Sequence, residues 1–129
     1  MNNGPIIADA SAVLALLKQE PFGRFDHRRL FQAIISAVNL SEVLERLCSG
    51  GLSESEADEA VATLNLRVQH FDEPQARLAA YLRPRTRGAG LSLGDRACLA
   101  LGNSLRCPVV TADRAWASLD VGVEVILIR

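Results

Sequence analysis

The chain has 129 residues and is 49% hydrophobic, so one domain can bury a core without disulfides or a structural metal. Its 14 basic and 15 acidic residues give a formal net charge of −1, which disfavours a protein that holds nucleic acid through charge alone. Three cysteines (Cys48, Cys98 and Cys107) without a C-x-x-C pair disfavour a disulfide framework and a zinc site. We therefore expect one domain over residues 1–129.

The sequence also gives an expectation about location. The N-terminus lacks a charged segment followed by a long apolar run, and no stretch reaches the length needed to cross a bilayer. Cys48 and Cys98 fall within apolar helical patterns, where buried free thiols are common. These features predict a cytoplasmic protein that does not contact a membrane.

Short apolar segments alternate along the chain with longer segments of helical periodicity. In chain order, the sequence predicts a strand at residues 5–8, a helix at 11–19, a strand at 33–38, helices at 41–49 and 53–65, a strand at 66–71, helices at 74–82 and 92–106, and strands at 108–111 and 123–128. This order predicts an α/β fold, in which a mostly parallel five-stranded sheet has helices on both faces. Parallel strands joined by right-handed crossovers end at one edge of the sheet, where ligands bind.

Residues at the predicted helix ends support these boundaries. Gly50 and Gly51 end the second helix, and Ser53 with Glu56 forms a capping-box pattern at the start of the third. The segment 83–90, rich in Arg, Pro and Gly, is predicted to be a flexible loop.

Four acidic residues follow predicted strands or open a predicted helix. Asp9 comes directly after the first strand, Glu42 lies just past the second, and Asp113 follows the fourth. Asp95 lies at the start of the long helix that leads into the fourth strand. Because the carboxyl ends of parallel strands share an edge, we expect these four carboxylates to converge there.

Helix capping is the alternative role for each acid taken singly. A carboxylate at a helix start accepts hydrogen bonds from free amides and interacts favourably with the helix dipole. Ser92 and Asp95 fit a capping box, and Asn39 with Glu42 nearly does. As a group, however, two carboxylates about 4 Å apart repel by roughly 4 kcal/mol at an effective dielectric near 20. Such a cluster must take up protons or bind cations.

The type of ligand indicates which cation is expected. A site made only of carboxylate oxygens suits Mg²⁺ or Mn²⁺, whereas His and Cys suit zinc. His27 and His70 are far apart in the sequence, outside any metal-ligand spacing, and are predicted to be surface or structural residues. The residues alone thus predict a magnesium or manganese site.

The four acids lie in four longer segments: D-A-S-A at Asp9, N-L-S-E-V-L at Glu42, L-S-L-G-D-R-A-C-L-A-L-G at Asp95 and T-A-D-R-A-W at Asp113. These segments resemble the PIN-domain family, and in particular its VapC-type toxins of type II toxin–antitoxin pairs. They occur in the family's order and span almost the whole chain. The middle third of the chain, residues 54–90, carries no matching motif.

The resemblance implies a fold and a site. It implies a single PIN domain, a three-layer sandwich with strand order 3-2-1-4-5. It also implies that Asp9, Glu42, Asp95 and Asp113 bind Mg²⁺ and form the catalytic site. Thr111 would support that site, with Ser11 as a further supporting residue.

The resemblance further implies an activity and partners. The expected activity is that of an endoribonuclease, which hydrolyses RNA phosphodiesters with the help of a metal ion. A cognate antitoxin is expected to neutralise the enzyme, and the enzyme is expected to form a homodimer. A histidine-driven ribonuclease is disfavoured because it needs two imidazoles as acid and base. Two alternatives stay open: a catalytically silent PIN-like binding module, and a nuclease directed at DNA.

Other signals are weaker. The glycines at 88, 90 and 94 resemble a nucleotide-binding loop but lack the preceding strand that such a loop requires. A phospho-acceptor receiver domain needs a lysine beside its acids, and Lys18 lies at the far end of its helix. The arginines of segment 83–90 are interpreted as a solvated loop, with RNA contact as the alternative. The aromatic and basic segment 22–31 is interpreted either as an amphipathic helix over the core or as part of an antitoxin groove.

Overall fold

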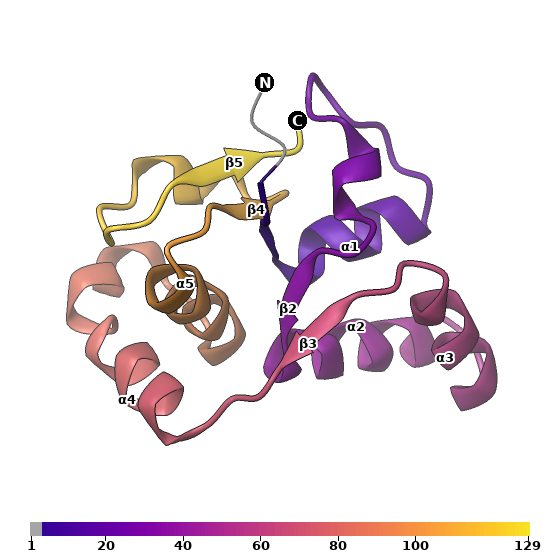
Figure 1. The fold of residues 1–129 in the computed structure, drawn as a ribbon, viewed down its shortest axis with the longest axis horizontal. Helices are drawn as coiled ribbons and strands as arrows, with labels where there is room; N and C mark the ends of the chain where they lie inside the picture. The colour runs from indigo at the N-terminus through magenta and orange to yellow at the C-terminus, as the bar shows by residue number, and fades with distance from the viewer. Residues whose placement is uncertain (1–3) are drawn as a thin grey trace.

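The computed structural model describes residues 4–129, which form a five-stranded sheet between two layers of helices (Figure 1). The strands are β1 (Ile7–Ala8), β2 (Ile34–Ser36), β3 (Arg67–Gln69), β4 (Val109–Thr111) and β5 (Val125–Leu127). The α-helices are α1 (Ala10–Leu17), α2 (Ala37–Ser49), α3 (Glu54–Ala62), α4 (Glu73–Tyr81) and α5 (Leu93–Leu105). Short 3-10 helices are η1 (His27–Leu30), η2 (Pro84–Ala89) and η3 (Arg114–Ser118).

The strand order is β3-β2-β1-β4-β5, and every pairing is parallel. The predicted α/β fold, the five-stranded sheet and the strand order are thus confirmed. Because all five strands run the same way, their carboxyl ends lie at one edge of the sheet, which we call the carboxyl edge. β1 pairs with both β2 and β4, so the residue that follows β1 lies at the middle of this edge.

The sheet separates two hydrophobic cores, because successive strand residues point to opposite faces. Ala8 packs in one core with residues of α1, α2 and α3, whereas its neighbour Ile7 packs in the other with residues of α4 and α5. Figure 1 shows the same division, with α4 and α5 on one side of the sheet and α1, α2 and α3 on the other. Both faces of the sheet are therefore covered, and its carboxyl edge remains for ligands.

The second strand is shorter than predicted. The sequence predicts a strand at 33–38 and a helix from residue 41, but β2 ends at Ser36 and α2 begins at Ala37. The Ser36 side chain accepts a hydrogen bond from the Val38 amide (3.2 Å) and so caps the helix. Glu42 therefore lies well inside α2 instead of just past a strand, and the near capping box predicted for Asn39 is wrong.

Three smaller predictions also need correction. The segment 83–90 contains the 3-10 helix η2, in which Thr86 is buried and donates a hydrogen bond to the Leu82 carbonyl (2.9 Å). Cys48 is exposed, whereas Cys98 is buried as predicted. Segment 22–31 is not an amphipathic α-helix, although Phe22 and Phe25 do pack against the core. Elsewhere the capping box at Ser53 is confirmed.

No helix within residues 4–129 is both long and apolar enough to cross a bilayer.

Close packing of α5 against the sheet depends on Gly102. A Cβ atom placed there would lie 2.5 Å from Val109 Cγ1, 2.9 Å from Val123 Cγ2 and 3.2 Å from the Cys107 carbonyl oxygen. Val109 is fully buried in the sheet, Val123 packs against the same core, and the carbonyl belongs to the backbone, so an added methyl group would force these groups apart.

We therefore expect Gly102→Ala to lower the free energy of unfolding by about 1–3 kcal/mol, the usual effect of overpacking. Ser104→Ala is the matched control, because Ser104 is exposed on the same helix. Urea denaturation of both variants measures the effect. Equal stability of the two variants would show that α5 is not packed as tightly as described.

Candidate active site

Asp9 is a buried carboxylate at the middle of the carboxyl edge. It is 4% exposed, and its Oδ2 accepts hydrogen bonds from Ser11 Oγ (2.6 Å) and Thr111 Oγ1 (2.8 Å). Asp9 occupies the N-cap position of α1, yet its side chain makes no capping hydrogen bond. Capping therefore does not explain why this position carries an acid.

Two hydroxyl groups join the start of α1 to the end of β4. Ser11 Oγ accepts a hydrogen bond from the Ala112 amide (2.9 Å), and Thr111 Oγ1 accepts one from the Asp113 amide (3.0 Å). The hydroxyls lie 3.2 Å from each other. This network places the backbone of Asp113 next to the hydroxyl that binds Asp9.

Glu42 reaches the same edge from inside α2. Asn39, one turn earlier on the same helix face, donates from Nδ2 to Glu42 Oε1 (2.8 Å) and to the Gly94 carbonyl oxygen (3.0 Å). The Glu42 carboxylate lies directly against Gly94, where an added Cβ would overlap both of its oxygens. α2 and α5 thus meet beside the Glu42 carboxylate.

Asp95 and Asp113 do serve as caps. Asp95 Oδ2 accepts a hydrogen bond from the Ser92 amide (3.0 Å), which completes the predicted capping box of α5. Asp113 is exposed and accepts a hydrogen bond from the Ala115 amide (3.0 Å) at the start of η3. An ionised carboxylate has about four acceptor positions, so one capping bond does not exhaust its capacity for a cation.

Electrostatics links three of the four acids. The pKa of Asp9 is raised from 3.8 to about 6. Burial is the largest cause, the hydrogen bonds from Ser11 and Thr111 oppose the rise, and the charges of Asp95 and Glu42 add to it. The Asp113 carboxylate is not among these charges: only the Asp113 backbone amide joins the network, by donating to Thr111 Oγ1.

The arrangement can be compared with the needs of a divalent cation. Among residues 4–129, no three Asp, Glu, His or Cys side chains are close enough to hold an ion directly. Mutual repulsion separates unscreened carboxylates, and Mg²⁺ usually binds one or two carboxylates directly and keeps several waters. Asn39 Oδ1 is buried without a hydrogen-bond partner in the described chain, so it can accept from such a water. The oxygen-only donor set fits Mg²⁺.

Cys98 is buried near three of these acids. Its thiol is fully buried, and burial together with the charges of Asp9, Asp95 and Glu42 raises the pKa of that thiol. Cys98 is therefore a neutral thiol of the hydrophobic core close to the three acids.

Sequence reasoning missed Asn39 and Gly94 as parts of the site. The spacing of Asn39 and Glu42, three residues apart, was a usable signal, because such residues share one helix face. The need for glycine at position 94 had no local signal, since it depends on a side chain from another helix.

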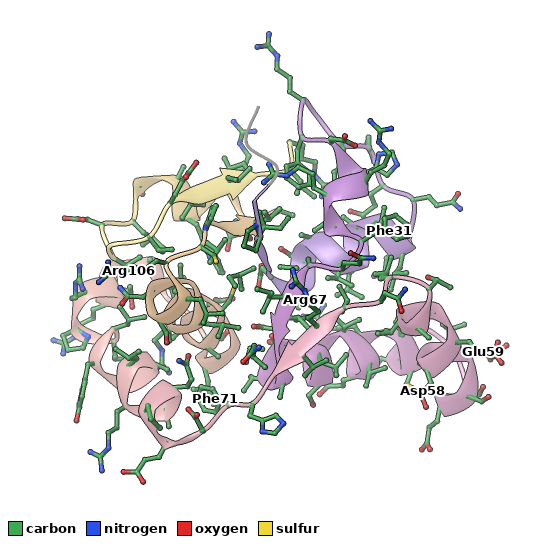
Figure 2. All side chains as sticks on the ribbon, viewed as in Figure 1. Phe31, Asp58, Glu59, Arg67, Phe71 and Arg106 are labelled. Carbon is green, nitrogen blue, oxygen red and sulfur yellow. The ribbon has the colours of Figure 1, made fainter. Side chains whose placement is uncertain are left out.

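A second feature of the surface lies away from the acids. A cavity of about 510 Å³ at the amino ends of β1 and β2 is lined by Phe31 and Arg67, among others (Figure 2). It opens at the opposite edge of the sheet from Asp9, so it is not part of the candidate site.

The raised pKa of Asp9 makes its ionised form destabilising in the absence of a cation. A rise from 3.8 to about 6 corresponds to about 3 kcal/mol of unfolding free energy lost at neutral pH. Asn still accepts hydrogen bonds from both hydroxyls, so Asp9→Asn should stabilise the metal-free protein by about 1–3 kcal/mol at pH 7.

The sign of the effect fixes its pH dependence. Below pH 3.8 the carboxyl is protonated in both states, and stability is lost as the pH rises through about 6. The stability difference between Asp9→Asn and wild type should therefore grow between pH 4 and pH 7, measured by urea denaturation in EDTA. The exposed Asp58 supplies the control variant, Asp58→Asn. A difference that does not change with pH would contradict the raised pKa.

Gly94→Ala tests the contact between α5 and Glu42. The added methyl group meets the flexible end of the Glu42 side chain, which can swing away. We expect a change in unfolding free energy within about 1 kcal/mol and a lower pKa of Asp9, because the charge of Glu42 moves off.

Titration of the Asp9 carboxyl carbon by NMR measures this pKa. Gly50→Ala is the control, since a Cβ at Gly50 meets only carbonyl oxygens at 3.4 and 3.5 Å. An unchanged Asp9 pKa in Gly94→Ala would mean that Glu42 does not lie where described.

Comparison with known proteins gives a consistent result. The PIN domain model matches residues 6–122. No curated protein matches significantly. Many solved structures share the fold, among them DNA-bound VapBC from Salmonella typhimurium (TM-score 0.76, 18% identity, 97% of this chain and 98% of that chain). A toxin–antitoxin complex from Klebsiella pneumoniae also does (0.68, 15%, 94% and 95%).

A third similar structure is VapC20 of Mycobacterium tuberculosis, described as a toxin that cleaves the sarcin-ricin loop (TM-score 0.69, 20% identity, 92% of this chain and 98% of that chain). At these identities, the structural neighbours establish a shared fold. The match to the PIN domain model covers most of the chain, because it extends from β1 to the loop before β5. The chain belongs to the PIN-domain family.

Proposed function

We propose that this chain is a VapC-type toxin, a Mg²⁺-dependent endoribonuclease that hydrolyses RNA phosphodiesters. The observation that carries the proposal is the buried Asp9 carboxylate, whose pKa the charges of Glu42 and Asp95 help to raise. Membership of the PIN-domain family supports it. A further support is the structural neighbour VapC20, which is described as a cleaving toxin.

In this proposal, Asp9, Glu42, Asp95 and Asp113 hold the cation. Bound Mg²⁺ would lower the pKa of a water molecule and stabilise the charge that develops on the leaving oxygen. Ser11 and Thr111 fix the Asp9 carboxylate through Oδ2. Asn39 fixes Glu42 and, through its buried Oδ1, orients water at the site.

The histidines do not suggest a different chemistry. His27 lies in η1, and His70 follows the edge strand β3. They belong to separate elements and do not supply the acid–base pair that a metal-free ribonuclease requires. Hydrolysis by water is therefore proposed, with no role for the RNA 2′-hydroxyl.

The proposal extends to partners and location. A cognate antitoxin is proposed because structural neighbours include a toxin–antitoxin complex. A homodimer is proposed because the chain resembles VapC-type toxins, which usually form homodimers. The cytoplasm is the proposed site of action, in keeping with the free thiols of all three cysteines.

Cleavage of a defined RNA tests the activity. In the presence of Mg²⁺, the wild-type protein should give RNA products that end in a linear phosphate and not in a 2′,3′-cyclic phosphate. Addition of EDTA should stop the reaction. Loss of an outer partner of a metal ligand costs about 10–100-fold in activity, so Asp9→Asn, which removes a ligand, should cost about 100-fold or more. Asp58→Asn is the control because Asp58 is exposed on α3, far from the carboxyl edge (Figure 2).

Three outcomes would contradict the proposal in different ways. Cleavage that resists EDTA, or products that end in 2′,3′-cyclic phosphate, would exclude water activated by a cation. Preferential cleavage of a DNA strand of the same sequence would favour a DNA-directed nuclease. Growth arrest on expression that Asp9→Asn does not relieve would favour a silent binding module.

A further inference from the structure

A basic cavity lies beside the candidate active site. It encloses about 310 Å³ between η2 and the start of α5, and its lining includes Arg83, Arg87 and Arg96. Within residues 4–129, no Asp or Glu belongs to this lining. In a chain whose net charge is −1, three guanidinium-bearing residues around one cavity mark a local preference for anions.

One of these arginines carries an unused donor. Arg96 donates from Nη1 to the Ala79 carbonyl oxygen (3.0 Å), which ties α5 to α4. Its Nε is buried and has no hydrogen-bond partner in the described chain. A buried donor without a partner is unfavourable, and the side chain that carries this donor lines the cavity.

The cavity and the acids share a wall. Ser92 lines the cavity, and its amide donates to Asp95 Oδ2 (3.0 Å). Leu93, the first residue of α5, also lines the cavity, where the helix dipole favours negative charge. An anion held here would lie one helix turn from an acid of the proposed site.

Arg85 shows that the arginines of this segment are not equivalent. Its Nη2 donates to the Asp120 carbonyl oxygen (2.9 Å), and it does not line this cavity. The buried Thr86 holds η2 through the Leu82 carbonyl. The segment is thus fixed so that Arg83 and Arg87 face the cavity while Arg85 anchors the backbone.

We propose that this cavity, the arginine cavity, binds a backbone phosphate of the RNA substrate next to the one that is cleaved. The inference rests on the proposed ribonuclease function and deepens it. By holding a neighbouring phosphate, the cavity positions the strand relative to Asp9. Contacts of this kind position a strand but do not read its bases.

Binding can be measured separately from cleavage. A fluorescein-labelled single-stranded RNA of about 12 nucleotides is titrated with protein in EDTA, and Kd is determined by anisotropy over a range of salt concentrations. The Arg83→Gln/Arg87→Gln double variant should bind about tenfold more weakly, and its salt slope should fall by about 0.7 because one phosphate is no longer neutralised.

Two controls separate this effect from others. Arg85→Gln reports on loosening of η2, because Arg85 anchors that segment. Arg67→Gln removes the same charge at the opposite edge of the sheet (Figure 2). Both should bind RNA as wild type does. Arg96 is left intact in these variants because its hydrogen bond to the Ala79 carbonyl links two helices. As a separate measurement, the NMR signal of Arg96 Nε–H should shift when RNA is added.

The outcomes are distinct. Three results would each overturn the proposal. The double variant could bind RNA as tightly as wild type, Arg85→Gln could weaken binding as much as the double variant does, or wild type could fail to bind RNA. A DNA strand of the same sequence should show the same change in slope, and an effect confined to RNA would refute a phosphate contact. Weaker binding by the double variant supports the cavity even if wild type proves unable to cleave RNA, which would contradict only the proposed ribonuclease activity.

Discussion

The candidate site is organised around a carboxyl group that is buried where separate segments of the chain meet. Asp9 follows the central strand β1, and residues Ser11 and Thr111 donate to the same oxygen of its carboxylate although they are 100 positions apart. The sheet order makes this possible by placing β1 beside β4. Burial opposes ionisation of Asp9, and two neighbouring acids oppose it further. A bound divalent cation, as proposed for this site, would offset both effects.

The sequence predicts the features that depend on local pattern. Alternating apolar segments and helical stripes predict the parallel sheet, and the position of Asp9 directly after the first strand predicts its place at the carboxyl edge. The boundary between β2 and α2 is not predicted because the apolar run at 33–38 continues through Ala37 and Val38, while the deciding signal is the single capping hydroxyl of Ser36. The Asn39–Gly94 contact joins residues 55 positions apart, and no local pattern encodes it.

Capping and cation binding need not exclude each other at Asp95 and Asp113. Both side chains accept a hydrogen bond from an amide near a helix start, which orients each carboxylate before any ligand arrives. From the sequence alone, capping and metal binding are rival interpretations of these acids. In the structure, the first describes how two of the carboxylates are held, and the second describes what they are proposed to bind. Asp9 differs, because hydroxyl groups hold it instead.

The position of Cys98 has a consequence for how the site responds to its chemical surroundings. The thiolate is the form of cysteine that reacts with oxidants and alkylating agents. Burial and the nearby acids raise the pKa of Cys98, so the sulfur stays protonated and inert at physiological pH. Alkylating agents and oxidants that modify exposed thiols should therefore leave Cys98 unmodified while the chain is folded.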